Sequence, residues 1–333
     1  MKDNYRYSLQ KYSGRNSRHT CPACGRPHCF TLYVDAAGNP LANDVGRCEH
    51  LNSCGYHRTP AQYFAENPQE HGREKYRPAE SQRQQKEVRT DYIPFGLIQK
   101  SEGTANGLIR YLSKFFAQKD LERVTKMYHL GSTRSGEIIY PQIDRCGMCR
   151  TGKVMAYGAD GHRVKRSECD AVDWLHARLM RQQGKTASDY HLRQCLFGEH
   201  LLPKRPDSIV CVVEGEKSAV IASLVFPQYV WVATGGKYGL SPRMCKSLAG
   251  RDVLVYADAD ATGFWSEKIK SLTFCRSIRL SDWARDEPQG SKRDIADLIM
   301  EERKPLGKPT TIGDILRWNQ ELGFPKERFT INI

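Results

Sequence analysis

The second half of the chain alternates short, uniformly apolar runs with segments in which apolar residues recur at helical spacing. Runs this short and this apolar are typical of strands buried on both faces of a parallel sheet. Helical segments between such strands are typical of the crossovers in a doubly wound fold. We therefore expect a parallel α/β domain over residues 206–300. Its strands are the runs SIVCVV, YVWVA, RDVLVY and SIRL, and its helices lie in EKSAVIASLVF and GFWSEKIKSLTF.

The segment ahead of this domain, residues 92–205, has a mixed pattern. Leu108, Tyr111, Leu112 and Phe115 would share one face of a helix. Strand patterns follow at GEIIYPQID and GKVMAYG. We interpret this segment as a basic α+β subdomain.

The remaining stretches are less regular. Residues 66–91 are charged and almost free of apolar side chains, which indicates a solvated linker. Residues 1–65 hold the densest group of cysteines together with several aromatic residues, and residues 301–333 form a mixed C-terminal tail.

Charge favours a polyanionic partner. The 333 residues include 51 lysines and arginines against 38 acidic residues, a net charge of +13. Such an excess favours nucleic acid, because binding to phosphates releases counterions. No apolar run approaches the roughly 18 residues of a membrane span, and the N-terminal segment lacks the apolar core of a secretory signal. We expect a soluble, cytoplasmic protein with no membrane partner.

Four cysteines in the N-terminal stretch predict a structural zinc site. Cys21 and Cys24 form a C-x2-C pair, and Cys48 and Cys54 follow after a segment that reads as a hairpin. Twelve cysteines in a cytoplasmic chain indicate metal ligands or free thiols rather than disulfides. Two thiolate pairs around a hairpin are typical of a zinc ribbon. Less favoured substitute ligands are His28, Cys29, His50 and His57.

A second C-x2-C pair, Cys146 and Cys149, lies between the two strand patterns of the basic subdomain. No second pair accompanies it, as a four-thiolate zinc site would require. We interpret it as the turn of a hairpin with incidental cysteines.

Three carboxylates follow two of the predicted parallel strands. Glu214 ends the first strand, and Asp258 and Asp260 come directly after RDVLVY. The carboxyl ends of neighbouring parallel strands share one edge of a sheet, so the three side chains can converge there. Carboxylates that close repel one another unless a hard cation such as Mg²⁺ or Mn²⁺ lies between them. The competing interpretation is that the aspartates cap the following helix.

This acidic pattern resembles the Toprim domain of DnaG-type primases, topoisomerases and some nucleases. Glu214 and the Asp258/Asp260 pair stand where that family has its Glu and its DxD motif. Thr234-Gly235-Gly236 matches the intermediate glycine turn, and residues 292–298 look like the acidic segment that follows in primases.

The order of zinc ribbon, basic subdomain and Toprim domain resembles that of DnaG-type primases. Strand–Pro–x–x–Asp at residues 137–144 and the Phe-Gly turn at Phe197 resemble their basic subdomain. Residues 47–57 and 195–202 look closer still to shortened primase-like proteins of Bacteroides-type mobile elements. The chain departs from many primases in using cysteines alone for zinc and in showing no helicase-docking domain.

A helicase fused to this chain is not expected. Gly184-Lys185-Thr186 resembles the end of a Walker A motif, but Leu179 stands where the leading glycine belongs.

The resemblance implies a primase-like nucleotidyltransferase that joins nucleoside triphosphates on single-stranded DNA. Glu214, Asp258 and Asp260 would hold two Mg²⁺ or Mn²⁺ ions, and a replicative helicase acting in trans is an allowed partner. Residues expected to contact nucleotide or template are Lys153, Arg163, Lys165 and Lys217, with Phe30, Tyr33 and Tyr56 as stacking faces or as the small core of the ribbon. The alternatives are a Toprim-type metal-dependent nuclease and a non-catalytic single-stranded-DNA-binding replication protein.

Overall fold

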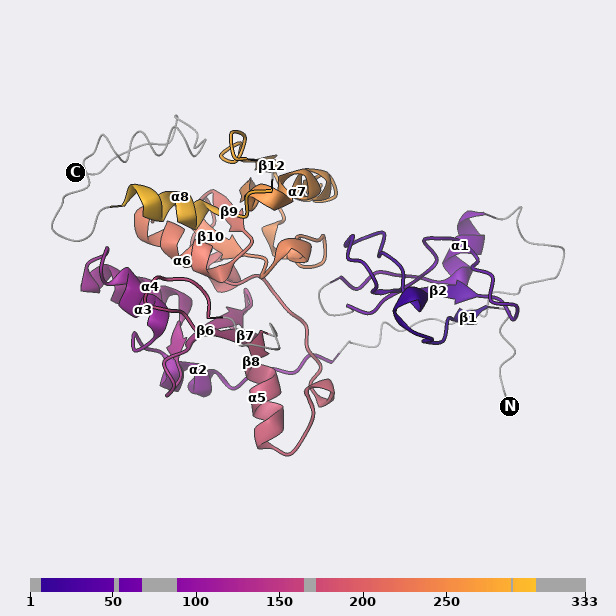
Figure 1. The fold of residues 1–333 in the computed structure, drawn as a ribbon, viewed down its shortest axis with the longest axis horizontal. Helices are drawn as coiled ribbons and strands as arrows, with labels where there is room; N and C mark the ends of the chain where they lie inside the picture. Colours follow the sequence, from indigo (N-terminus) through magenta and orange to yellow (C-terminus); the bar gives the residue numbers. More distant parts are fainter. Residues whose placement is uncertain (1–6, 51–53, 68–88, 165–171, 289, 304–333) are drawn as a thin grey trace. The chain divides into compact units, whose positions relative to one another are not determined.

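The computed structural model of the chain falls into two compact units, Met1–Thr90 and Asp91–Ile333 (Figure 1). The residues that the structure describes are 7–50, 54–67, 89–164, 172–288 and 290–303.

The first unit is an antiparallel ribbon. Its four strands lie in the order β1-β2-β3-β4, and the sheet is followed by helix α1 (Pro60–Glu66). Thr59 and Gln62 form a capping box at the start of this helix, in which each side chain accepts a hydrogen bond from the backbone of the other. The strands are β1 (Ser8–Leu9), β2 (Phe30–Val34), β3 (Gly46–Cys48) and β4 (His57–Arg58).

The core of this unit consists mainly of cysteines. The buried apolar residues in its described part, apart from the thiols, are Phe30, Leu32 and Val45, and Tyr56 packs against the cysteine cluster. So small an apolar core cannot stabilise a fold alone, which is the usual reason for a structural metal.

The second unit begins with three helices and an antiparallel sheet of order β5-β6-β7-β8. Every residue of β6 is buried, so this strand is covered on both faces. The elements are α2 (Phe95–Ser101), α3 (Gly107–Leu112), α4 (Gln118–Tyr128), β5 (Gly131–Ser132), β6 (Ile138–Ile143), β7 (Cys149–Met155), β8 (Asp173–Trp174) and α5 (Leu175–Gln182).

The same unit continues into a parallel sheet of order β10-β9-β11-β12. Helix α6 packs against β10 and α8, and α7 packs against β12 (Figure 1). All four predicted strands are present. The elements are β9 (Val210–Val213), α6 (Glu216–Val225), β10 (Val230–Ala233), β11 (Asp252–Tyr256), α7 (Thr262–Ile269), β12 (Ser277–Leu280) and α8 (Ile295–Glu302).

One hydrophobic core joins the two sheets. It extends from Leu108 of α3 through the β9–β11 strands to Ile299 of α8. Tyr128 at the end of α4 crosses it: its hydroxyl donates to the Trp231 carbonyl oxygen (2.8 Å) and lies 2.6 Å from Ser223 Oγ. The expected fold class, an N-terminal zinc ribbon followed by mixed α+β and parallel α/β parts, is confirmed. Among the described residues, no helix is both long enough and apolar enough to cross a membrane.

Candidate functional site

The register of the parallel sheet brings the three candidate carboxylates to one edge. Val213 at the end of β9 pairs with Tyr256 at the end of β11. Glu214 directly follows the first strand, and Asp258 and Asp260 follow the second within a few residues. The side chains influence one another electrostatically, as the convergence of parallel strand ends predicts.

Burial and mutual repulsion make this cluster costly to ionise. Burial raises the pKa of Glu214 to about 7, and the charge of Asp260 adds to the shift. Burial, followed by the charge of Glu214, raises the pKa of Asp258 to about 8. Asp294 and Asp297, at the start of α8, add further negative charge around Asp258. A divalent cation is the counter-charge that would allow these groups to ionise together at neutral pH.

The two aspartates do not cap the following helix with their side chains. Asp258 stands at the N-cap of a short 3-10 turn (Ala259–Ala261), but its side chain makes no capping hydrogen bond. The N-cap of α7 is Ala261. The helix-cap alternative is therefore contradicted, and the two aspartates need another explanation.

The carboxylate oxygens at this edge are the ligands that a hard cation prefers, but in the metal-free structure they are not gathered around one point. Glu214 Oε2 is buried with no hydrogen-bond partner, while the backbone amide of Lys237 donates to the same carboxylate. Among the described residues, the sets of three or more ligand atoms that all lie within 4.8 Å of one another contain only cysteine and histidine side chains. The oxygens of the three carboxylates are therefore more widely spread. Glu214, Asp258 and Asp260 are the residues that would hold Mg²⁺ or Mn²⁺.

Lys153, which the sequence suggested as a nucleotide contact, is buried beside this edge. Its ammonium donates to Glu216 Oε2 (3.1 Å) and to the carbonyl oxygen of Gly235 (2.5 Å). The Gly235 amide donates in turn to the carbonyl oxygen of Glu214 (2.9 Å). Lys153 thus ties β7 to both turns around Glu214, and its contact with a nucleotide stays a prediction.

Lys237 also lies at this edge, and the sequence pattern did not single it out. Its ammonium donates to the carbonyl oxygen of Asp260 (2.8 Å) and lies 3.6 Å from Asp260 Oδ2. The indole of Trp265 donates to the Lys237 carbonyl oxygen (2.8 Å). The sequence could have indicated this position, because Lys237 directly follows the glycine turn at the carboxyl end of a predicted strand.

The other basic candidates lie at different places. Arg163 is exposed and forms a β-bridge with Tyr157. Lys217 lies on α6, with its ammonium 3.6 Å from Asp297 Oδ1. Lys165 lies outside the described residues. Their contacts with nucleic acid stay predictions.

The four predicted zinc ligands come together in the N-terminal unit. The Sγ atoms of Cys21, Cys24, Cys48 and Cys54 all lie within 4.8 Å of one another, and those of Cys21 and Cys54 are 3.7 Å apart. Zinc–sulfur bonds of about 2.3 Å in a tetrahedron place the sulfurs about 3.8 Å apart, so the arrangement fits Zn²⁺. A hydrogen bond from the Cys21 thiol holds the pKa of Cys24 well below its usual range, while hydrogen bonds with Cys21 raise the pKa values of Cys48 and Cys54 in the metal-free cluster.

Two of the less favoured substitutes lie beside this set. Cys29 and His50 form a second group with Cys48, in which the Cys29 and Cys48 sulfurs are 3.9 Å apart. The Cys29 thiol also donates to the Arg26 carbonyl oxygen (3.1 Å). Cys48 is therefore shared, and the set of four cysteines is the more complete one.

The aromatic side chains of the ribbon divide between two roles. Phe30 is fully buried, and its ring packs against Tyr56 with the centroids 5.7 Å apart, so both belong to the small core. Tyr33 stacks on the ring of His57 at 5.9 Å and 7° and hydrogen-bonds it. Of Phe30, Tyr33 and Tyr56, Tyr33 lies outside the core cluster.

Cys146 lies in the turn of the predicted hairpin between β6 and β7, and Cys149 is the first residue of β7. Asp144 organises the turn by accepting hydrogen bonds from the amides of Cys146 (2.9 Å) and Met148 (3.0 Å). Cys146 is exposed and Cys149 is buried, so the two thiols serve no common site. The predicted hairpin is confirmed, and the absence of a role for its cysteines stays an interpretation.

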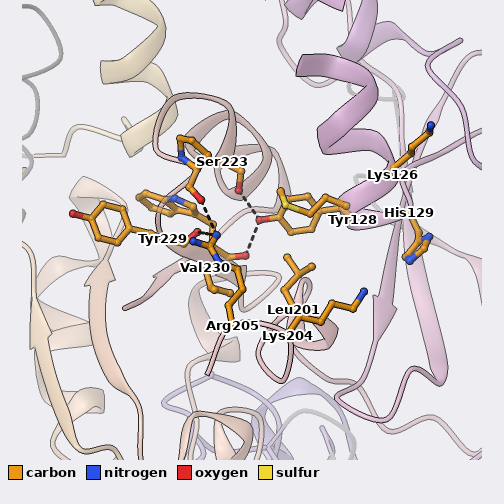
Figure 2. A pocket seen from close by; sticks show the side chains of 12 residues that line it. Lys126, Tyr128, His129, Leu201, Lys204, Arg205, Ser223, Tyr229 and Val230 are labelled. Carbon is orange, nitrogen blue, oxygen red and sulfur yellow. Dashed lines mark hydrogen bonds between the residues drawn. The ribbon is translucent and has the colours of Figure 1, made fainter. Parts of the chain in front are cut away.

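A cavity of about 260 Å³ lies at the opposite edge of the parallel sheet, where β10 begins at Val230 (Figure 2). Lys126 and Lys204 lie at its rim, and the Tyr128 hydroxyl reaches Ser223 across it (Figure 2). Because the candidate carboxylates follow the carboxyl ends of the strands, this cavity is not part of their site.

Two families match parts of the chain. A zinc beta-ribbon finger family matches residues 5–69, so the first unit is a zinc ribbon. A domain family of unknown function (DUF6371) matches residues 106–259. No curated protein matches the chain.

Three of the solved structures to which the chain is similar are primases, each with a TM-score below 0.4. The primase fragment of the bacteriophage T7 primase-helicase is 13% identical with a TM-score of 0.37, covering 85% of this chain and 94% of that one. The Aquifex aeolicus primase, with its zinc-binding and RNA polymerase domains, is 10% identical with a TM-score of 0.36, covering 95% of this chain and 80% of that one. A DnaG primase catalytic domain bound to single-stranded DNA is 13% identical with a TM-score of 0.39, covering 69% of this chain and 78% of that one.

Proposed function

We propose that the chain is a primase-like nucleotidyltransferase that joins nucleoside triphosphates on a single-stranded DNA template. The observation that carries the proposal is the group of Glu214, Asp258 and Asp260 at the carboxyl edge of a parallel sheet. Burial and the neighbouring negative charges raise the pKa values of Glu214 and Asp258. The side chains of the two aspartates make no capping hydrogen bond to the following helix. The same three residues resemble the Glu and the DxD motif of a Toprim domain.

The chemistry follows from what these residues can hold. Mg²⁺ or Mn²⁺ bound there would lower the pKa of an attacking 3′-hydroxyl and neutralise charge on the departing pyrophosphate. Glu214 leaves β9 on a turn whose backbone is anchored by Lys153 and Gly235, and the Lys237 amide donates to its carboxylate, so the residue is positioned before any ligand arrives. Such preorganisation is what transfer of a nucleotidyl group mainly demands of a protein.

The rest of the chain supports a nucleic-acid substrate. The net charge of +13 supplies attraction for a phosphate backbone. The zinc ribbon offers Tyr33 as a stacking face for an unpaired base. A replicative helicase acting in trans remains an allowed partner.

The decisive experiment incubates the purified chain with single-stranded DNA, labelled nucleoside triphosphates and Mg²⁺ or Mn²⁺. Extended products are expected from the wild-type chain. Glu214→Gln, and Asp258→Asn combined with Asp260→Asn, should abolish them because the amides remove the charge that binds metal. DNA binding and melting temperature should be unchanged or raised, since mutual repulsion is relieved in the metal-free protein.

A matched control is Asp252→Asn, an acid-to-amide change at the other end of the same strand β11, where Asp252 pairs with Arg276. This variant should keep activity. Cut template instead of extended product would identify a metal-dependent nuclease. Binding without product in the wild-type chain would leave a non-catalytic DNA-binding protein.

A further inference from the structure

The charges of the candidate site do not balance when its proposed ligands are present. Two divalent cations bring four positive charges, whereas three carboxylates and a nucleoside triphosphate bring about seven negative ones. Enzymes that transfer phosphoryl or nucleotidyl groups meet such an excess with lysine or arginine side chains directed at the phosphates. Lysines at this edge of the sheet are therefore the side chains to compare.

Lys153 has a carboxylate of its own. Its ammonium lies 3.0 Å from Glu216 Oε1, and the two side chains are 9% and 3% exposed. Because Glu216 is buried in that ion pair, it keeps Lys153 occupied whatever binds at Glu214. The charge of Lys153 is therefore already balanced.

Lys217 has a similar arrangement. Its partner is Asp297 on α8, at 3.6 Å, which is outside the three carboxylates proposed to bind metal. Neither Lys153 nor Lys217 depends on a candidate metal ligand for its counter-charge.

Lys237 differs because its partner is one of the candidate metal ligands. Its ammonium donates to the Asp260 carbonyl oxygen (2.8 Å) and lies 3.6 Å from Asp260 Oδ2. The side chain is 30% exposed, so solvent and ligand can reach it. Once a cation takes the Asp260 carboxylate, Lys237 loses most of the charge that attracts it there.

The backbone around Lys237 is fixed independently of its side chain. The Lys237 amide donates to the Glu214 carboxylate, and its carbonyl oxygen accepts from Trp265 Nε1 (2.8 Å). The residue therefore stays between the turns that carry Glu214 and Asp260 while the ammonium changes partner.

We propose that Lys237 contacts the phosphates of the incoming nucleoside triphosphate, replacing its contact with Asp260 when a divalent cation occupies that carboxylate. The inference rests on the proposed function and names a further substrate-binding residue for it. In the metal-free protein the lysine neutralises Asp260, and in the loaded site it neutralises the triphosphate.

Equilibrium binding tests this without requiring turnover. Titrating ATP in the presence of Mg²⁺ by calorimetry should show Lys237→Met weakened about tenfold to a hundredfold, the range for loss of a charge-assisted hydrogen bond. Lys237→Arg keeps the charge and should restore most of the affinity. Mn²⁺ alone should bind Lys237→Met no more weakly than wild type, because the competing ammonium is gone.

A matched control is Lys270→Met on the surface beyond α7, where the ammonium pairs with Glu267 at 2.8 Å and is 67% exposed. It should bind Mg²⁺–ATP like wild type. Melting curves should show Lys237→Met folded, because the backbone contacts of Lys237 do not need its side chain. In extension assays the substitution should raise KM for nucleotide more than it lowers kcat.

The outcomes separate this inference from the proposed function. Equal affinity of wild type and Lys237→Met for Mg²⁺–ATP overturns the inference even if both make primers. A wild-type chain that binds Mg²⁺–ATP but makes no product contradicts the proposed function, while the comparison of affinities still decides the role of Lys237. A wild-type chain that does not bind Mg²⁺–ATP overturns both.

Discussion

Replacing Lys153 with Met should destabilise the second unit strongly. The ammonium is the charged partner of Glu216, whose side chain is only 3% exposed, and it also donates to the Gly235 carbonyl oxygen. Methionine has a similar length but leaves the Glu216 carboxylate buried without its counter-charge. Removing one partner of a buried ion pair costs about 3–5 kcal/mol, which in a unit of this size lowers Tm by about 10 °C.

The same geometry predicts what happens when both charges are removed. Lys153→Met combined with Glu216→Gln removes both charges of the pair, so the double variant should be clearly more stable than Lys153→Met alone. Replacing both members of a buried ion pair with uncharged groups often changes the free energy of unfolding very little. A coupling energy of about 2 kcal/mol or more is expected from the double-mutant cycle.

Urea denaturation followed by circular dichroism measures these differences. Lys270→Met is the control, because the exposed Lys270–Glu267 pair should contribute less than about 1 kcal/mol. If Lys153→Met unfolds within about 1 kcal/mol of wild type, or if the cycle shows no coupling, the buried pair does not hold β7 to the turns around Glu214.

Three further measurements test other parts of the molecule. Elemental analysis should find about one zinc per chain, lost together with the fold of the ribbon in Cys21→Ser combined with Cys48→Ser; full zinc retention would contradict the four-cysteine site. His200 should contribute a loss of about 3 kcal/mol of stability between pH 7 and pH 4, because burial lowers its pKa from the unfolded value of 6.5 to about 4 and protons then bind the unfolded chain more tightly. The raised pKa values of Glu214 and Asp258 act in the opposite direction, so the His200 contribution is measured as the difference in pH dependence between wild type and His200→Gln, and identical pH profiles would contradict it. Affinity for single-stranded DNA should drop about tenfold or more between 50 and 200 mM salt, and a flat response would show that the positive charge is not used on phosphates.

Sequence patterns predicted the parallel sheet because β9, β10 and most of β11 are buried on both faces, whereas the edge strand β12 alternates between exposed and half-buried residues. Continuous apolar runs such as VCVV in β9 and VWVA in β10 leave few other structures for those residues. The carboxylates were predictable for the same reason, since strand ends in a parallel sheet meet at one edge. The zinc ligands were predictable from their spacing alone.

The roles of the lysines could not be predicted in the same way. Lys153 is 63 residues from Glu216 in sequence, and nothing in the strand pattern indicates that its side chain is buried against that partner. Lys237 depends on contacts with Asp260, 23 residues away, and with Trp265. Tertiary contacts decide whether a lysine is structural or available, and periodicity reports only the secondary structure around it.

The comparison of Lys153 with Lys237 gives a physical criterion for a functional cation. A lysine whose buried partner stays in place when ligand binds has its charge permanently balanced, so its effect is on stability. A lysine whose partner is itself a candidate metal ligand has a charge that becomes available when the metal binds. Lys153, paired with Glu216 at 3.0 Å, is the first kind, and Lys237, beside Asp260 at 3.6 Å, is the second. The criterion predicts opposite phenotypes for two charge-removing substitutions at the same edge of one sheet: lost stability for Lys153→Met and lost nucleotide affinity for Lys237→Met.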